Sequence, residues 1–223
     1  MSTASNVIFD RCEFYGNQAA RAGALDIFST SGVVVSNSIF QGNTSTGSGG
    51  GGALWIGSGG STQVINCTIV DNNATSNTVG GLLRSGSTVL VRNTILWDNS
   101  GPGGAQNAAN QMTGGTSATY CIVEGGFSGT GNLNSDPTFT DAPAGDFTLS
   151  ASSPGIDAGN NASVPGAITL DLAGNNRLDD VSSGPDTGAG SGWHVDIGAY
   201  EVQGSIGGVA HLWPPSHPLP GSP

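Results

Sequence analysis

Three side chains of complementary chemistry recur at similar places in the chain. Asp26, Trp55 and Arg84 each follow a leucine in short, similar apolar segments. If their neighbours point inward, strand alternation turns these three side chains outward, and we expect them to form a stack. Such a stack could hold a sugar ring, whose apolar face packs on Trp while its hydroxyls bond the charged groups. The other interpretation is an ordinary solvated sheet face that screens an exposed Trp55.

A pair of acidic residues offers a second kind of chemistry. Asp71 and Asp98 occupy comparable places one repeat apart. Two carboxyl groups at a suitable separation could hydrolyse a glycoside or hold calcium, whereas the simpler interpretation is that both cap turns. A lyase would need a base. Lysine is absent, so Arg11, Arg84 or Arg92 would have to serve, although arginine hardly gives up its proton. Beyond Asp71 and Asp98, the sequence leaves the catalytic residues unknown.

Acidic residues are also dense beside Gly and Asn in the C-terminal part. Calcium binds about six to eight oxygen ligands, and a bound ion would stabilise loops. No cofactor is required by the sequence, and the EF-hand calcium-loop pattern is absent. In the alternative interpretation, Asp157 and Asp196 accept backbone hydrogen bonds and Arg177 neutralises one of them. The candidate calcium ligands are Asp157, Asp171, Asp179 and Asp180.

These residues belong to a repeat of short segments rich in Val and Ile. The segments recur at intervals of roughly 25 to 30 residues, a length typical of one supersecondary unit that buries its apolar face by stacking on its neighbours. Their alternation is typical of strands. We therefore predict an all-β solenoid of about five coils, with two or three strands per coil. The first strands are expected at residues 7–14, 34–39, 64–69, 90–95 and 119–123, and the second at 23–27, 52–56 and 81–85.

Two sets of polar residues recur inside the coils. Asn17, Asn43, Asn72 or Asn73, and Asn99 follow the first strand, where each could hydrogen-bond the equivalent Asn of the next coil. Cys12, Cys67 and Cys121 are separated by two coils each. Coils lie about 4.8 Å apart, so these cysteines lie beyond the reach of a disulfide. We predict three free, buried thiols.

The composition excludes several classes of protein. Gly makes up 38 of 223 residues without a Gly-X-Y period, so collagen is excluded. The net charge of -11, from 16 acidic and five basic residues, would repel nucleic acid and anionic membranes. The chain has neither an apolar run of about 18 residues nor a recognisable export signal. We expect no nucleic-acid partner and no membrane insertion of this segment.

A series of motifs follows where the repeat stops, near Asn132. Together with the coils, this series resembles the right-handed parallel β-helix proteins of the choice-of-anchor Q type, over roughly residues 6 to 203. The resemblance implies a right-handed parallel β-helix with an irregular C-terminal cap, in secreted or surface-attached bacterial proteins. It implies no single activity, since similar coils occur in polysaccharide lyases, glycoside hydrolases and adhesins. The motifs are Asp136-Pro137-Thr138-Phe139, Gly145-Asp146-Phe147-Thr148-Leu149, Ser153-Pro154-Gly155-Ile156-Asp157-Ala158-Gly159, Asp171-Leu172-Ala173-Gly174-Asn175-Asn176-Arg177 and Val195-Asp196-Ile197-Gly198-Ala199-Tyr200-Glu201.

The expected organisation has three parts. Coils occupy residues 1–131, the cap of the same domain occupies 132–203, and a Pro/Gly-rich tail or the start of a further module occupies 204–223. The first coil begins without a cap, and Leu212-Trp213-Pro214-Pro215 looks like the opening strand of a bacterial immunoglobulin-like module. We expect a fragment of a larger protein, with its export signal outside this sequence.

The predicted function is that of an extracellular or cell-surface module. We expect a noncatalytic monomer that binds a polysaccharide or cell-surface glycan, or has an adhesive or structural role. The alternative is a carbohydrate-active enzyme, a polysaccharide lyase or glycoside hydrolase. An enzyme should have a cleft with converging acids beside the Trp55 face, whereas a binding or spacer module should present a flat surface.

Overall fold

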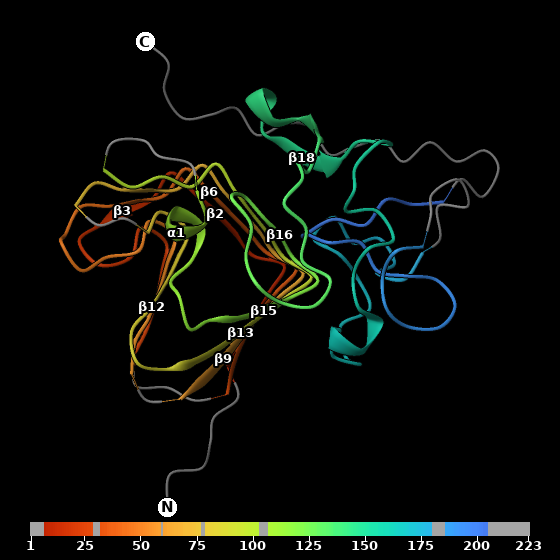
Figure 1. Cartoon of the computed structure of the whole chain (residues 1–223), viewed down its shortest axis with the longest axis horizontal. Helices are drawn as coiled ribbons and strands as arrows, with labels where there is room; N and C mark the ends of the chain where they lie inside the picture. Colours follow the sequence, from red (N-terminus) through yellow and green to blue (C-terminus); the bar gives the residue numbers. More distant parts are fainter. Residues whose placement is uncertain are drawn as a thin grey trace, which may run out of the picture.

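The repeated segments form a stack of parallel strands. The computed structural model describes residues 7–28, 32–58, 60–76, 79–102, 107–179 and 186–204. In these parts of the chain, four parallel sheets each take one strand from successive coils, and Figure 1 shows the equivalent strands overlying one another. The predicted all-β solenoid is confirmed. It has about four turns, because only two strands of a fifth coil form.

The strands are short, and their bounds repeat from coil to coil. The first sheet contains β1 (Val7–Asp10), β5 (Val33–Ser36), β9 (Ser61–Ile65), β13 (Thr88–Arg92) and β15 (Ser117–Thr119). The second contains β2 (Glu13–Tyr15), β6 (Ile39–Gln41), β10 (Thr68–Val70), β14 (Ile95–Trp97) and β16 (Ile122–Val123). The third contains β3 (Gln18–Ala19), β7 (Thr44–Ser45) and β11 (Asn73–Ala74), and the fourth β4 (Leu25–Ile27), β8 (Leu54–Ile56) and β12 (Leu82–Arg84).

The remaining elements are few. The one-turn helix α1 (Ala108–Gln111) lies in the fourth coil, where the amide oxygen of Asn107 caps its first turn. Beyond the coils, β17 (Phe139–Asp141) and β18 (Asp146–Leu149) form an antiparallel hairpin around the short 3-10 helix η1 (Ala142–Ala144). A second 3-10 helix, η2, spans Asn161–Ser163. None of the described helices is long and apolar enough to cross a membrane.

The first three coils have more strands and corners than the sequence predicted. Three coils have four strands instead of two or three. The predicted first strand divides at a residue in the left-handed backbone region, and a further two-residue strand, β3, β7 or β11, precedes the predicted second strand. These corner residues have φ between 45° and 53°, a conformation that Asn tolerates better than most residues. A second corner follows β2, β6, β10 and β14. The first corner contains Arg11, Asn37, Asn66, Asn93 and Tyr120, and the second contains Gly16, Gly42, Asp71 and Asp98.

The interior is mainly apolar, and one polar row runs along its first corner. Val35, Val64 and Val91 of the first sheet are fully buried, as are the large residues that face them from the second sheet. The polar row contains alternating thiols and hydroxyls, each of which donates to the carbonyl two residues earlier. Its members are Cys12, Ser38, Cys67, Thr94 and Cys121. The interposed Ser and Thr separate the sulfurs.

The prediction of free cysteines is confirmed. None of the three forms a disulfide, and both Cys67 and Cys121 are fully buried. Burial raises the pKa of each of these two thiols to about 12, so both stay protonated at neutral pH. Cys12 lies in the first described coil and is only partly buried.

The predicted ladder of asparagines is also confirmed, with Asn72 as its third member. Each side-chain amide donates to the amide oxygen of the next coil at 2.9 Å, from Asn17 to Asn43, Asn72 and Asn99. Asn99 then donates to Gln111 of α1 at 2.7 Å. Because these side chains also bond backbone groups, they satisfy polar atoms at a buried corner.

The chain after the coils lies beside the solenoid, on the right in Figure 1. Its apolar side chains cover the outer face of the second sheet. Leu149, Ile156 and Ile197 pack on Ile95 and Ile122, whereas Phe147, Ala199 and Tyr200 pack on Ile39 and Val70. This sheet is therefore apolar on both faces, which explains why its strands contain so many consecutive Ile, Val and Leu residues.

Candidate functional site

The predicted stack of Asp26, Trp55 and Arg84 forms only in part. Asp26 pairs with Trp55 across β4 and β8, but Leu83 occupies the next place and Arg84 pairs with Ile56. The sequence prediction was one residue out of register on β12. The reason is packing, because Leu82 is fully buried and takes the inward place beside Leu54. The guanidinium of Arg84 instead donates to the carbonyl of Ser87.

Trp55 is covered by side chains of its own chain. Only 8% of this residue is exposed, because the guanidinium carbon of Arg21 lies 4.3 Å from the centre of its ring and Phe28 packs beside it. Arg21 in turn donates to Asp26 at 2.5 Å. The repeat pattern did not indicate Arg21 as a neighbour of Trp55, although Arg21 precedes the Asp26 strand by only a few residues. The flat face of the indole is therefore occupied by a cation–π contact.

Asp71 and Asp98 lie one above the other at the second corner, after β10 and β14. Both have positive φ, and the N–H of Asp71 donates to the carbonyl of Trp97. The N–H of Asp98 donates to a carboxyl oxygen of Glu124 at 2.9 Å. Burial raises the pKa of both aspartates; Asp98 also raises that of Asp71, and Asp136 raises that of Asp98. The predicted pair thus belongs to a group of four neighbouring acids, Asp71, Asp98, Glu124 and Asp136.

An open pocket of about 440 Å³ lies beside this group of acids, between the end of β14 and the β17–β18 hairpin. Asp98 contributes to its wall, whereas Asp71 does not. Its polar and aromatic lining consists of two aromatic rings, three carboxylates and two threonines. They are Trp97, Phe139, Asp98, Asp136, Asp141, Thr138 and Thr140.

Local hydrogen bonds hold the acidic residues of the pocket in place. Asp136 accepts from the N–H of Thr138 at 2.7 Å, which supports the left-handed backbone of that threonine. Asp141 caps η1 by accepting from the N–H of Ala144. Neither Asp136 nor Asp141 was predicted from the sequence as a site residue. The Asp-Pro-Thr-Phe motif was a signal for Asp136, since its acid stands next to a turn, but nothing in the sequence placed that motif beside Asp98.

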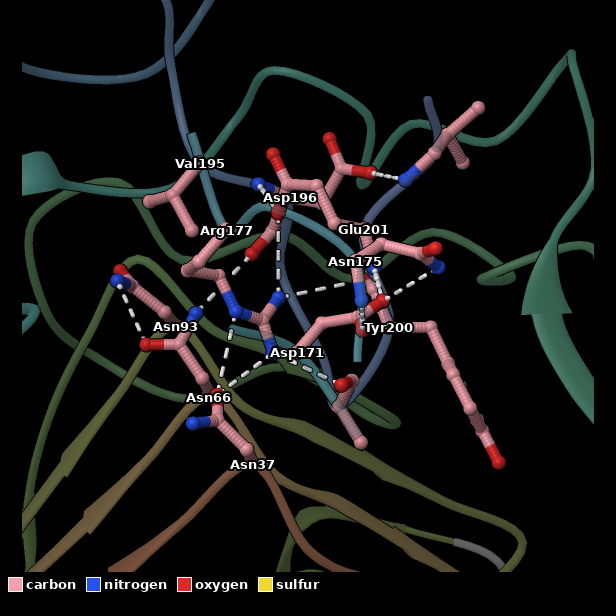
Figure 2. A network of polar contacts seen from close by, with 12 residues as sticks. Asn37, Asn66, Asn93, Asp171, Asn175, Arg177, Val195, Asp196, Tyr200 and Glu201 are labelled. Atoms are coloured by element: carbon pink, nitrogen blue, oxygen red, sulfur yellow. Dashed lines mark hydrogen bonds and ion pairs between the residues drawn. The ribbon is translucent and has the colours of Figure 1, made fainter. Parts of the chain in front are cut away.

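The C-terminal acids surround a buried arginine (Figure 2). Arg177 is 1% exposed and forms an ion pair with Glu201 at 3.2 Å. It also donates to the amide oxygen of Asn37 at 2.8 Å and to the carbonyls of Ala199 and Tyr200. In the alternative interpretation of the sequence, Arg177 neutralises Asp157 or Asp196; its ion-pair partner in the structure is Glu201.

The other carboxylates of this network bond backbone amides. Asp196 accepts from Asp157 and Val202, and Asp171 accepts from Glu201 and Asn175. Asp157 is itself fully buried and donates its N–H to Asp196. Burial raises the pKa of Asp196 to about 7 and that of Glu201 well above its ordinary value. These groups form a structural network at the base of the C-terminal region.

Calcium binding by the C-terminal acids stays a prediction. Asp157 and Asp171 lie inside the network, Asp179 is partly exposed, and Asp180 lies outside the described residues. Within the described ranges, no group of three or more His, Cys, Asp or Glu side chains is arranged to hold a metal ion. A calcium titration followed by chelation would test this prediction.

The first-corner asparagines hold the network against the solenoid (Figure 2). Asn37 accepts from Arg177, and Asn66 donates to the carbonyl of Asp196 at 3.5 Å. Asn93 donates to the carbonyl of Asn160 at 3.1 Å and accepts from its N–H at 2.8 Å. The three asparagines are almost completely buried, so this part of the corner is an interface with the C-terminal region.

Comparison with known proteins agrees with this architecture. A family model described as a right handed beta helix region matches residues 1–163, which include the coils and the β17–β18 hairpin. No curated protein and no solved structure gives a significant match. Parallel pairing in every described coil and the extent of the family match lead to the same conclusion: the chain belongs to the right-handed β-helix family.

Proposed function

We propose that this chain is a noncatalytic, glycan-binding module of an extracellular or cell-surface protein of the choice-of-anchor Q type. The observation that carries the proposal is the pocket between β14 and the β17–β18 hairpin, where aromatic rings and polar groups meet. The setting and the family subtype rest on the sequence motifs alone. We also propose that the chain is a monomer, which light scattering would test.

The composition of the pocket suits a sugar. Trp97 and Phe139 are partly exposed, so each offers an apolar ring surface to the pocket. The carboxylates of Asp98, Asp136 and Asp141 can accept hydrogen bonds from hydroxyl groups, and charged acceptors make the stronger bonds. A site with apolar surface and a few converging polar groups is the usual form of a small-ligand site.

Trp97→Leu tests the proposal. Leucine keeps apolar bulk against Phe139 but removes the flat ring, so binding to a glycan should weaken by about 1 kcal/mol. The matched control is Trp193→Leu, because Trp193 is 59% exposed and does not line the pocket. A glycan array would identify ligands, and calorimetry would measure the two variants. Equal affinity of both variants and the parent for every glycan would contradict the proposed site.

A carbohydrate-active enzyme is the second candidate, favoured by the acids of the same pocket. A glycosidase needs one protonated and one ionised carboxyl group. Burial and the neighbouring Asp136 raise the pKa of Asp98, as a general acid requires. Assays for new reducing ends and unsaturated products would detect hydrolysis or elimination. Product formation that is lost in Asp98→Asn and in Asp136→Asn would replace the noncatalytic proposal with this one.

A further inference from the structure

We propose that the glycan bound at the β14–hairpin pocket is cationic, an oligosaccharide that carries protonated amino groups. This inference rests on the proposed function and names its ligand class. It follows from the charges that surround the pocket, from its aromatic wall and from where the chain's arginines lie.

The pocket is strongly negative. Asp98, Asp136 and Asp141 line it. Glu124 lies next to Asp98 and accepts a hydrogen bond from the N–H of Asp98. No basic side chain occurs among the described residues of the lining. Opposite charges at close range attract strongly in a partly desolvated site, whereas an acidic sugar would be repelled.

The arginines of the chain have partners elsewhere, and lysine is absent. Each guanidinium contacts a group outside the pocket lining. The contacts are Arg11 with Asp10, Arg21 with Asp26, Arg84 with the carbonyl of Ser87, Arg92 with Gln63, and Arg177 with Glu201. None of these arginines therefore lines the described part of the pocket.

The neighbouring acids also raise one another's proton affinity. Burial and then Asp136 raise the pKa of Asp98; burial and then Asp98 and Asp136 raise that of Glu124. Each ionised group thus disfavours the ionised form of the next. A bound ammonium group would reverse this effect, and a neutral sugar would not.

The aromatic rings favour an organic cation over a bare metal ion. A metal such as calcium prefers a shell of oxygen ligands, and the described residues contain no group arranged to supply one. Trp97 and Phe139 instead line the pocket, and aromatic rings attract an ammonium group by cation–π interaction and a sugar ring by apolar contact. An amino sugar combines both features.

Paired oligosaccharides test the proposal directly. The probes are a β-1,4-linked glucosamine oligomer and its fully N-acetylated counterpart of equal length, titrated by calorimetry at mildly acidic pH, where the amines are protonated. We expect the glucosamine oligomer to bind at least about tenfold more tightly. Its affinity should fall when the pH is raised above the pKa of the amines, and also when salt is added.

Isosteric variants locate the effect. Asp98→Asn and Asp136→Asn keep a side-chain oxygen, so each can still accept a local hydrogen bond, and Asn tolerates the left-handed backbone of position 98. Each should weaken binding of the glucosamine oligomer several-fold. Asp186→Asn is the matched control, because it removes the same charge from an exposed residue that does not line the pocket. Thermal melting would confirm that each variant is folded.

The outcomes separate this inference from the proposed function. Equal or tighter binding of the N-acetylated oligomer, still sensitive to Trp97→Leu, would overturn the cationic ligand and keep a glycan site. An equal loss in Asp186→Asn, or equally tight binding of polylysine, would show general attraction to the net charge of -11 and overturn the inference. No binding of either oligomer would overturn it too, while the glycan array separately decides the proposed function.

Discussion

Single asparagines at the first corner have two structural roles. The left-handed backbone of Asn93 turns the coil, and its side chain binds both the N–H and the carbonyl of Asn160. The same residue type therefore shapes the solenoid and attaches the C-terminal region to it. This double use explains why an uncharged residue with one donor group and one acceptor group is buried there.

Replacing Asn93 should separate these two roles. Asn93→Ala should lower the free energy of unfolding by about 2 to 4 kcal/mol, since it strains the left-handed backbone and leaves polar groups of Asn160 without partners. Asn93→Gly relieves the strain alone, so it should recover about 1 kcal/mol of that loss. Urea unfolding measures both values. Equal stability of the two variants would show that the backbone conformation contributes nothing.

Trp55 should now be sensitive to substitution, although the sequence suggested an outward side chain with little effect on stability. Because Arg21 and Phe28 cover the indole, Trp55→Ala should lower the free energy of unfolding by about 3 kcal/mol. The exposed Trp193 is the control, and Trp193→Ala should change stability by less than about 0.5 kcal/mol. Similar denaturation midpoints for both variants would contradict the packing described for Trp55.

Much of the solenoid could be predicted from the sequence because each coil repeats the same local pattern. The strand positions, the ladder from Asn17 to Asn99 and the separated cysteines all follow from that period. The first corners were not predicted. Asn66 and Asn93 continue the alternation of polar and apolar residues that is typical of a strand, although the backbone turns at both residues. The pocket was missed for a different reason: Asp98 and Asp136 lie far apart in the sequence, and only the packing of the C-terminal region brings them together.

At the scale of the elements, the backbones of successive coils approach closely where the third and fourth sheets meet, and this close approach requires glycine. A Cβ atom on Gly52 would fall on the carbonyl oxygen of Gly80 and on the backbone of Asn73. The backbone of Gly52 does not need a left-handed conformation, so space is the only constraint there. The Gly pairs that precede β8 and β12 are thus explained by packing between successive coils.

Gly52→Ala tests this packing. The added methyl group has to displace backbone, so the free energy of unfolding should fall by about 3 kcal/mol. Gly49→Ala is the matched control, because an added Cβ there would have no neighbour within 4 Å, and the smaller entropy of the unfolded chain should keep it neutral or slightly stabilising. Thermal and urea unfolding would measure both. An unchanged free energy of unfolding in Gly52→Ala, together with a clear loss in Gly49→Ala, would contradict this packing.

At the scale of the whole molecule, one polar network joins the C-terminal region to the solenoid. Arg177 contacts Asn37 of the coils and Glu201 of the C-terminal region, so the two parts share a single buried cation (Figure 2). Several buried carboxyl groups surround that one positive charge. Their protonation should therefore affect how firmly the C-terminal region is attached.

The pH dependence of stability follows from these carboxyl groups. Burial raises the folded-state pKa of Asp196 from 3.8 to about 7, and it raises the pKa of Glu201 in the same direction. The folded protein thus binds these protons more tightly than the unfolded chain does. Their contribution to stability is complete at acidic pH and is lost as the pH rises through the folded pKa. The melting temperature should fall between about pH 4 and about pH 7, the interval between the unfolded and the folded pKa of Asp196.

Calorimetry across this range would measure the effect, and Asp196→Asn provides the control. Asparagine keeps an acceptor for the N–H of Asp157 or Val202 but does not titrate, so the slope of melting temperature against pH should become shallower. Hydrogen exchange should show the protection of residues 195–202 decreasing first at higher pH, because these residues surround the titrating groups. A melting temperature that rises from acidic to alkaline pH would mean that the carboxylates are stabilised in the fold as anions, contrary to the burial described here.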